Sequence, residues 1–292
     1  MFFRSSIKTW STPVSKEKAA LIQCIFCGND AFLPSLSCDG FSYVKCAKCR
    51  LVQINPQPSV SDIENRYTKT YGKDYFFYEL ENEAAFLELQ KKALADAGFE
   101  KMELELFRKA KRQPCVLDLG CATGALLAFL RDRGWKARGV EISPSGIYAR
   151  EKRNLDIWDQ TIQNCNFPSE SFDVVLASHF IEHLNNPREV IREIWRILRT
   201  GGCLMLTTPN ISSFQAKLFG NNWRSAIFDH LFLFSFRTIK AMLKAESFAI
   251  ESINTWGGLA AGTAPLPIKI FADKAVKILG IGDVMLVKAK KP

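Results

Sequence analysis

The fold of this 292-residue chain is decided by residues 115–130, which read CVLDLGCATGALLAFL. The short apolar run from Cys115 to Leu119 is typical of a buried strand. Gly120 and Gly124 mark a turn, and the leucines after it recur at helical spacing. A glycine turn between a strand and a helix presents free backbone N–H groups, so the stretch predicts a site for a nucleotide-like ligand.

Alternating strand and helix patterns continue to the end of the sequence. Further strands are expected at residues 136–141, 155–158, 172–177, 203–207, 250–256 and 284–289, and helices at 143–153, 187–200, 235–246 and 268–279. This alternation predicts an α/β fold with a doubly wound, seven-stranded, mostly parallel sheet, in which the last strand is the candidate antiparallel member. Residues 210–234 are expected to be irregular and aromatic.

Three parts are expected along the chain. Residues 1–60 form a small N-terminal zinc-binding module, residues 61–112 a helical linker and approach segment, and residues 113–292 the main domain. The approach segment contains four tyrosines and, over residues 79–112, the pattern of one long helix or a helix pair.

Two C-x-x-C pairs carry the prediction of zinc. Cys24 and Cys27 are separated from Cys46 and Cys49 by eighteen residues, and such pairs complete a tetrahedral shell of four thiolates with no open position. Unrelated core cysteines and a disulfide framework are the alternatives. The sequence has no apolar leader pattern and no uninterrupted apolar stretch of about eighteen residues, so no membrane span and a cytoplasmic, reducing location are expected, which favours metal binding.

The net charge of +9 leaves a nucleic-acid partner open. No run of consecutive Lys or Arg exceeds two residues, however, so a diffusely basic surface is favoured over a nucleic-acid groove.

The residues around the glycine turn restrict the class of ligand that it can bind. A dinucleotide fingerprint would need glycines at positions 122 and 125, where the chain has Ala122 and Ala125. Glu141, at the end of the next strand, can accept hydrogen bonds from two ribose hydroxyls. Asp118 beside the turn disfavours a pyrophosphate and favours a sulfonium or ammonium group. An adenosyl ligand with a positive charge satisfies both carboxylates.

The order VLDLGCATG, GVEIS, FPSESFDVVLASHFIEHLNNP and LRTGGCLMLTTPN resembles the class I S-adenosylmethionine (SAM)-dependent methyltransferases over roughly residues 113–290. The segments CxxCG, CAKCRLVQINPQPS and YTKTYGKDYF resemble a zinc-knuckle segment that precedes this domain in one bacterial branch, whose members often modify sugars or other small metabolites.

The resemblance implies SAM as the cofactor and assigns its contacts. The implied cofactor site consists of Asp118, Gly120, Ala122 and Gly124 around the methionyl part, Glu141 on the ribose, Ile142 against the adenine, and Ser178 and His179 beside the cofactor. Many relatives have Gly-Asp after the third strand to hold the adenine amine, whereas the comparable place here offers Thr161 and Ile162. Apart from the resemblance, tyrosines four residues apart on a helix are usually half-buried packing residues. The functional alternative is that Tyr71 or Tyr75 closes over the cofactor or substrate.

The three histidines of the chain, His179, His183 and His230, follow strand ends and are expected near one edge of the sheet. His183 and His230 are the candidate catalytic bases, because a neutral imidazole can take a proton from a hydroxyl near pH 7. A hydrogen-bonded structural role is the alternative for each. Similar quinone-biosynthesis methyltransferases carry a divalent-metal motif, Glu-x-x-Glu-His, at the place of residues 179–183. Here His179 replaces the first Glu, and a metal on His179, Glu182 and His183 is a further alternative.

The sequence therefore predicts a SAM-dependent methyltransferase that methylates an oxygen or carbon of a small metabolite such as a sugar or nucleotide-sugar intermediate. An RNA methyltransferase and a non-catalytic, cofactor-binding regulatory protein are the competing hypotheses. The acceptor and the oligomeric state are not predicted.

Overall fold

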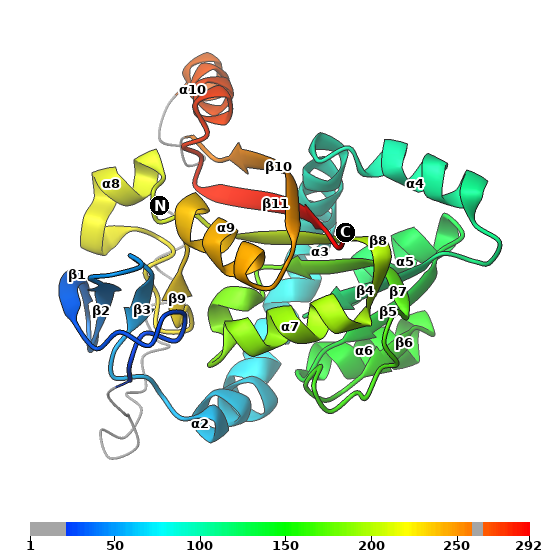
Figure 1. Cartoon of the computed structure of the whole chain (residues 1–292), viewed down its shortest axis with the longest axis horizontal. Coiled ribbons are helices and arrows are strands. Elements are labelled where there is room, and N and C mark those ends of the chain that lie inside the picture. The colour runs from blue at the N-terminus through cyan, green and yellow to red at the C-terminus, as the bar shows by residue number, and fades with distance from the viewer. Residues whose placement is uncertain (1–21, 259–264) are drawn as a thin grey trace.

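The computed structural model describes residues 22–258 and 265–292, apart from the side chains of residues 69–74 and 266. Its main sheet has seven strands in the order β10-β11-β8-β7-β4-β5-β6 (Figure 1). The strands are β4 (Cys115–Leu119), β5 (Lys136–Val140), β6 (Asp156–Trp158), β7 (Phe172–Ser178), β8 (Leu198–Pro209), β10 (Ala249–Trp256) and β11 (Val284–Lys290). β11 runs antiparallel to both of its neighbours, β8 and β10, whereas β4 to β8 pair in parallel. The predicted fold class and its antiparallel last strand are confirmed.

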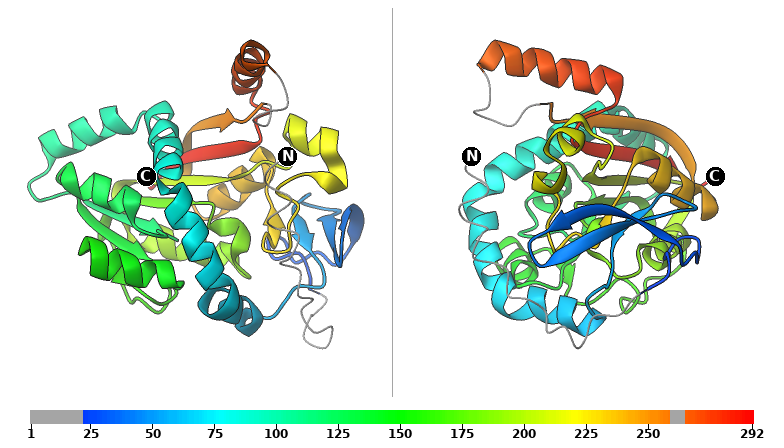
Figure 2. Two further views of the ribbon diagram at one scale, coloured as in Figure 1. Left: turned by 180° about the vertical axis from the view of Figure 1, so that it is seen from behind. Right: turned by 90° about the vertical axis from the view of Figure 1, so that its left-hand side faces the viewer.

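Helices cover both faces of this sheet (Figures 1 and 2). They are α3 (Tyr71–Asp96), α4 (Phe99–Lys109), α5 (Ala125–Asp132), α6 (Pro144–Arg153), α7 (Pro187–Ile197) and α9 (Phe236–Ala245), with α10 (Leu266–Leu279) at the edge. Neighbouring residues of β4 enter different clusters: Val116 packs with residues of α3, α4 and α5, and Leu117 packs with residues of α7 and α9. Because side chains of a strand alternate between faces, a sheet covered on both sides requires an uninterrupted apolar strand, as β4 provides.

The structure corrects the expected end of the helix that starts at residue 187. α7 ends at Ile197 and β8 begins at Leu198, so residues 198–202 belong to the strand and not to the helix. The register of β8 on β7 shifts between Leu198 and Cys203, which places Gly201 and Gly202 in an irregular stretch of the strand. The approach segment is helical from its start, as expected, since α2 (Val60–Asn65) and the π-helix η2 (Arg66–Thr70) lead directly into α3.

Residues 210–234 also contain regular structure. Ser213 caps the short helix α8 (Phe214–Phe219) by accepting a hydrogen bond from the Ala216 N–H, which explains why an aromatic segment becomes helical there. The 3-10 turn η4 (Gly220–Asn222) follows, and β9 (Phe232–Leu233) ends the segment.

A second, antiparallel sheet has the order β1-β2-β3-β9. Its first three strands, β1 (Phe32–Cys38), β2 (Phe41–Cys46) and β3 (Val52–Ile54), come from the N-terminal part, and β9 is contributed from far along the chain. Val52 pairs with Leu233 and Gln53 with Phe232. The boundaries 1–60, 61–112 and 113–292 stay a prediction, and residues 1–21 lie outside the described residues.

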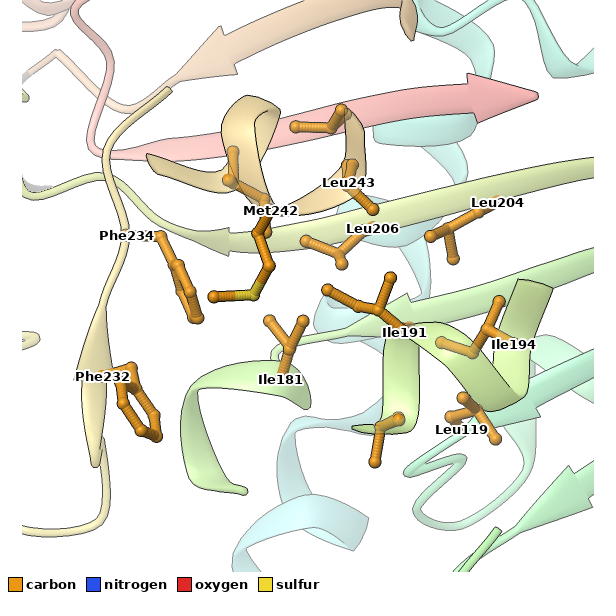
Figure 3. Close-up of a cluster of buried hydrophobic side chains, with 14 of the residues drawn as sticks. Leu119, Ile181, Ile191, Ile194, Leu204, Leu206, Phe232, Phe234, Met242 and Leu243 are labelled. Atoms are coloured by element: carbon orange, nitrogen blue, oxygen red, sulfur yellow. The ribbon is translucent and has the colours of Figure 1, made fainter. Parts of the chain in front are cut away.

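One buried cluster joins the two sheets. Figure 3 shows Phe232 and Phe234 beside Met242 of α9, and Ile181 between them and the α7 side chains Ile191 and Ile194. The same cluster includes Tyr43 and Ile54 of the second sheet. The apolar core therefore runs continuously from the cysteine-rich part to the main sheet. Among the described residues, no helix is both long and apolar enough to cross a membrane.

Candidate functional site

The glycine turn after β4 has the backbone conformation that only small residues tolerate. Gly120, Ala122 and Gly124 have φ values of 69°, 50° and 74°, in the left-handed region. A Cβ on Gly120 would lie 2.9 Å from the Phe180 ring, and one on Gly124 would lie 2.6 Å from Leu155. The turn therefore requires glycine at both positions for its conformation and for close packing.

Glu141 fixes the turn against the end of β5. Its Oε2 accepts a hydrogen bond from the Ala122 N–H at 3.1 Å, and its Oε1 accepts one from the Ser143 N–H at 2.8 Å. The Gly120 N–H donates to the Val140 carbonyl at 2.8 Å. Each carboxylate oxygen can accept a second bond, so Glu141 stays able to receive ribose hydroxyls.

Carboxylates collect around this turn. Burial, and then the charge of Glu141, raise the pKa of Asp118 to about 8. Burial likewise raises the pKa of Glu79 on α3 to about 8, with Glu141 and Glu83 adding to the increase. A bound positive charge would favour the ionised form of both groups, because opposite charges stabilise each other. This group of carboxylates therefore fits SAM, which carries a positively charged sulfonium and ammonium.

The sequence did not indicate that α3 would be fastened to the turn. Glu83 accepts a hydrogen bond from the Thr123 hydroxyl at 2.5 Å and pairs with Arg153 at 2.5 Å. Glu79 accepts a hydrogen bond from the Ser145 hydroxyl at the start of α6. The spacing of Glu79 and Glu83 places both on one face of a helix, but it does not indicate which residues that face contacts.

The other implied cofactor residues lie at several places along this edge. Ser178 ends β7, and the His179 N–H donates to the Thr207 carbonyl at 2.9 Å. Ile142 is half-buried after Glu141, Ile162 is buried in the main core, and the Thr161 carbonyl accepts from the N–H groups of the following turn. Their contacts with a cofactor stay predictions.

The two predicted tyrosines are on α3. Removal of the Tyr75 hydroxyl from water, followed by the charge of Glu79, raises its pKa above the usual value, and both Asp229 and Glu141 act on it as well. Tyr75 therefore lies within electrostatic reach of both sides of the site. Tyr71 begins α3, but its side chain lies outside the described part of the structure.

Glu182 and the histidines form a second group at the same edge, after β7. Glu182 is fully buried and accepts a hydrogen bond from the Thr208 hydroxyl at 3.0 Å. Burial acts to raise its pKa, but the hydrogen bond from His179 and the surrounding imidazoles outweigh it and lower the pKa to about 2. A carboxylate is therefore held ionised inside the protein.

The two candidate bases are in contact. The ring centroids of His183 and His230 are 4.8 Å apart. The Nδ1 of His230 lies 2.8 Å from the Ser225 carbonyl, and that of His183 lies 2.9 Å from the Asp229 carbonyl. Since a carbonyl only accepts, each Nδ1 carries a proton, and in a neutral ring the lone pair is on Nε2.

The environments of these two rings differ. His230 is 8% exposed, and burial, followed by the neighbouring His183, lowers its pKa to about 3. His183 is half-buried, and its Nδ1 also lies 2.8 Å from the Tyr67 hydroxyl. Arg66, next to this tyrosine, pairs with Asp229 at 2.5 Å. Sequence reasoning missed Arg66 and Tyr67, because nothing local relates η2 to a loop 116 residues away.

Within residues 22–258 and 265–292, two groups of side chains could hold a metal ion. One oxygen of Glu182 and one nitrogen from each of His183 and His230 lie within 4.8 Å of one another. The sequence pattern offered His179 as a third ligand beside Glu182 and His183, but the His179 Nδ1 instead lies 3.2 Å from the Glu182 Oε1, and His179 is outside this group of three.

The second group is the set of four cysteines predicted to bind zinc. The Sγ atoms of Cys24, Cys27, Cys46 and Cys49 all lie within 4.8 Å of one another. The Cys24–Cys49 and Cys27–Cys46 sulfur distances are 3.3 Å and 3.6 Å. Sulfurs bound tetrahedrally at about 2.3 Å from zinc would be roughly 3.8 Å apart, so these residues fit the ion.

Comparisons with known proteins agree with this fold. A family model described as a methyltransferase domain matches residues 90–253. The demethylmenaquinone methyltransferase of Chlorobaculum tepidum is 25% identical over 150 residues, which cover 49% of this chain and 57% of that protein. The malonyl-acyl-carrier-protein O-methyltransferase of a Paenibacillus species is 28% identical over 117 residues, covering 34% of this chain and 40% of that protein. The match thus spans about half the length of these curated relatives.

A solved structure shares the fold. The SAM-dependent methyltransferase of Archaeoglobus fulgidus superposes with a TM-score of 0.52 and 21% identity, covering 74% of this chain and 99% of that protein. The chain belongs to the methyltransferase domain family, in the class I SAM-dependent group.

Proposed function

We propose that the protein transfers the methyl group of SAM to an oxygen or carbon atom of a small metabolite, such as a sugar or nucleotide-sugar intermediate. The observation that carries this proposal is the arrangement at one sheet edge: an acidic glycine turn suited to a cationic adenosyl cofactor, and a half-buried histidine with its Nε2 available. The names of the relatives, a quinone methyltransferase and a methyltransferase acting on a carrier-bound malonyl group, support a small acceptor.

The proposed cofactor contacts follow from the geometry. SAM supplies an electrophilic methyl group when bound. In this proposal Asp118 faces the positive charge of SAM, and Glu141 accepts hydrogen bonds from its ribose hydroxyls. The Gly120–Gly124 turn lets the methionyl part approach the backbone closely. Tyr75, Ile142, Ser178 and His179 complete the walls of the site in this proposal.

We assign the role of base to His183 and a positioning role to His230. Burial makes a cationic His230 unfavourable, so that ring is a poor proton acceptor. His183 is closer to solvent, and its Nδ1–H is oriented by the Asp229 carbonyl, with the Tyr67 hydroxyl beside it. The acceptor's proton would move to Nε2 of His183 as its oxygen attacks the methyl group.

Calorimetric titration with SAM and with S-adenosylhomocysteine, followed by a transfer assay using radiolabelled SAM, tests the proposal. The acceptor panel contains sugars, nucleotide sugars, hydroxylated quinones and RNA. Cofactor binding with transfer to a small molecule is expected. The absence of cofactor binding would refute the proposal, and binding without turnover on any acceptor would favour a regulatory protein. Transfer to RNA with steeply salt-dependent binding would favour the RNA alternative.

A divalent metal at Glu182, His183 and His230 is the second candidate for activating the acceptor, because these three side chains place their ligand atoms close together. A dialysable chelator distinguishes the two mechanisms. Activity that survives chelation supports His183 as the base, whereas activity lost and then restored by a divalent cation, at constant zinc content, supports the metal.

Structural zinc in the N-terminal module is proposed on the four converging thiols. Elemental analysis should find one zinc per chain. In the variant Cys24→Ser/Cys27→Ser the zinc should be absent and the protein less stable, because binding energy of a structural ion contributes to folding. Cys165→Ser, which changes a half-buried cysteine elsewhere, is the matched control. Zinc retained by the double variant would contradict the assignment.

A further inference from the structure

Two helices carry half of the large exposed hydrophobic side chains among the described residues. On α10, Phe271 is 74% exposed and Ile278 is 85% exposed. The full set, called here the α8–α10 face, consists of Phe214, Leu218 and Phe219 on α8 and Ile268, Ile270, Phe271, Ile278 and Leu279 on α10. Large apolar side chains left exposed on two neighbouring helices point to an interaction site.

The two helices are tied together at one end of the molecule. The Phe214 N–H donates to the carbonyl of Ile281, which directly follows α10, at 3.0 Å. Gln215 donates to the Gly257 carbonyl at 3.3 Å, near the start of the connection to α10. Figures 1 and 2 show α10 standing outside the end of the main sheet, with α8 on the same side.

Contacts on its inner side fix α10 in this position. Val276 is buried, and its carbonyl accepts from the Thr255 hydroxyl at 3.3 Å. Asp273 accepts from the Gly258 N–H at 2.8 Å, and Lys277 pairs with Asp96 at 2.6 Å. The helix is thus held by one face, while Phe271 and Ile278, seven residues apart and therefore on one side, point away.

The charges on this surface are mostly positive. Lys217 lies on α8 and Lys274 on α10, whereas the other two lysines of α10 are paired, Lys269 with Asp273 and Lys277 with Asp96. Lys274 falls between Phe271 and Ile278 in the sequence and is exposed as they are. Large apolar side chains interleaved with lysines are typical of helices that lie in the interface of a bilayer, since the long side chain keeps its ammonium among lipid headgroups.

We propose that the α8–α10 face docks on an anionic lipid bilayer. The apolar side chains would enter the boundary between headgroups and acyl chains, and Lys217 and Lys274 would contact lipid phosphates. A second copy of the chain is the less suitable occupant, because a symmetric contact would bring lysines of one copy against lysines of the other. The proposal concerns where the enzyme works and does not depend on the identity of the acceptor.

Vesicle sedimentation with the full chain tests this proposal. Wild-type protein should sediment with phosphatidylcholine vesicles that contain phosphatidylglycerol, at least tenfold more strongly than with phosphatidylcholine alone, and less at high salt. Phe271→Ser/Ile278→Ser and Lys274→Glu should each reduce this partitioning by about tenfold or more. Leu104→Ser is the matched control, because Leu104 is 71% exposed on α4, away from this face.

Circular dichroism and cofactor titration verify that each variant is folded, which is expected because the altered side chains are exposed. Absence of wild-type binding, equal binding to both vesicle types, or undiminished binding by Phe271→Ser/Ile278→Ser would overturn the proposal. So would a wild-type dimer, seen by light scattering, that becomes a monomer in this variant without any vesicle binding. That last result would assign the α8–α10 face to a second copy.

Discussion

The glycine turn and the histidine group meet at one edge of the sheet but are built differently. The turn is made from one continuous stretch between Asp118 and Ser143, and backbone conformation and backbone N–H groups define it. The histidine group is made of side chains from η2, from the loop after β7, from β8 and from the segment before β9. A site built from backbone is encoded locally, whereas a site built from side chains depends on the packing of distant elements.

The largest effect is expected at His183. His183→Asn keeps a donor near the position of Nδ1 and removes the Nε2 lone pair, so kcat should fall about 10³-fold, the usual size of a lost general base. The affinity for SAM, measured by calorimetry, should change less than twofold. A fall in kcat of less than tenfold would show that His183 is not the base. A larger loss of kcat in His230→Asn than in His183→Asn would assign the base to His230 and the positioning role to His183.

At the glycine turn, Asp118→Asn should weaken SAM binding by about 10²-fold, because the buried carboxylate would no longer face a positive charge. Calorimetric affinities of the wild type and the variant provide the measurement. The exposed Asp132→Asn on the following helix is the control and should bind SAM normally. Equal affinities for Asp118→Asn and the wild type would show that the turn is not selective for charge.

The contrast between the two regions also explains what the sequence could predict. The alternation of apolar runs was sufficient for the seven strands, and the glycines with Asp118 and Glu141 indicated the cofactor turn, because both signals are local. The sequence could not indicate that Tyr67 meets His183 or that Glu79 reaches Ser145, since each contact requires α3 and η2 to lie across the edge of the sheet. Residues 210–234 were predicted to be irregular, but the Ser213 side chain caps the helix α8 within this segment.

Tyr67 offers a smaller and sharper test of the side-chain region. Tyr67→Phe removes a single hydroxyl beside the His183 Nδ1, and the loss of one hydrogen bond should lower kcat by about tenfold with the KM for SAM unchanged. Steady-state kinetics on the identified acceptor measure both constants. Tyr78→Phe, on the same run of tyrosines, is the control. A rise in the KM for SAM as large as the fall in kcat would place Tyr67 on the cofactor side.

The smallest effect is expected in the pH dependence of stability without cofactor. The folded-state pKa of Glu79 is raised to about 8, above about 4.3 in the unfolded chain, so its contribution to stability is fully present below pH 4 and is lost as the pH rises toward 8. The fall in Tm between pH 5 and pH 8 should therefore be a few degrees smaller in Glu79→Gln than in the wild type. Differential scanning calorimetry between pH 5 and pH 8 provides the measurement.

Glu88→Gln changes an exposed residue of the same helix and should show the same fall in Tm with pH as the wild type.

The same sign applies to the pH dependence that Asp118 contributes, because its pKa is also raised to about 8. Saturating SAM should therefore release protons on binding below pH 8, because the positive ligand favours the ionised carboxylates. Proton uptake on binding would contradict the acidic character assigned to the turn.

The pairing of β3 with β9 has a consequence for how the chain folds. About 180 residues separate the two strands, so the outer edge of β3 has no partner until nearly the whole protein has been synthesised. Contacts of such long sequence separation form late and slow folding. A ribosome-bound chain stalled before residue 230 should keep that edge open to chaperones or to other nascent chains. Completion of the cysteine-rich sheet would then coincide with the arrival of His230, so the step that closes this sheet would also complete the histidine group.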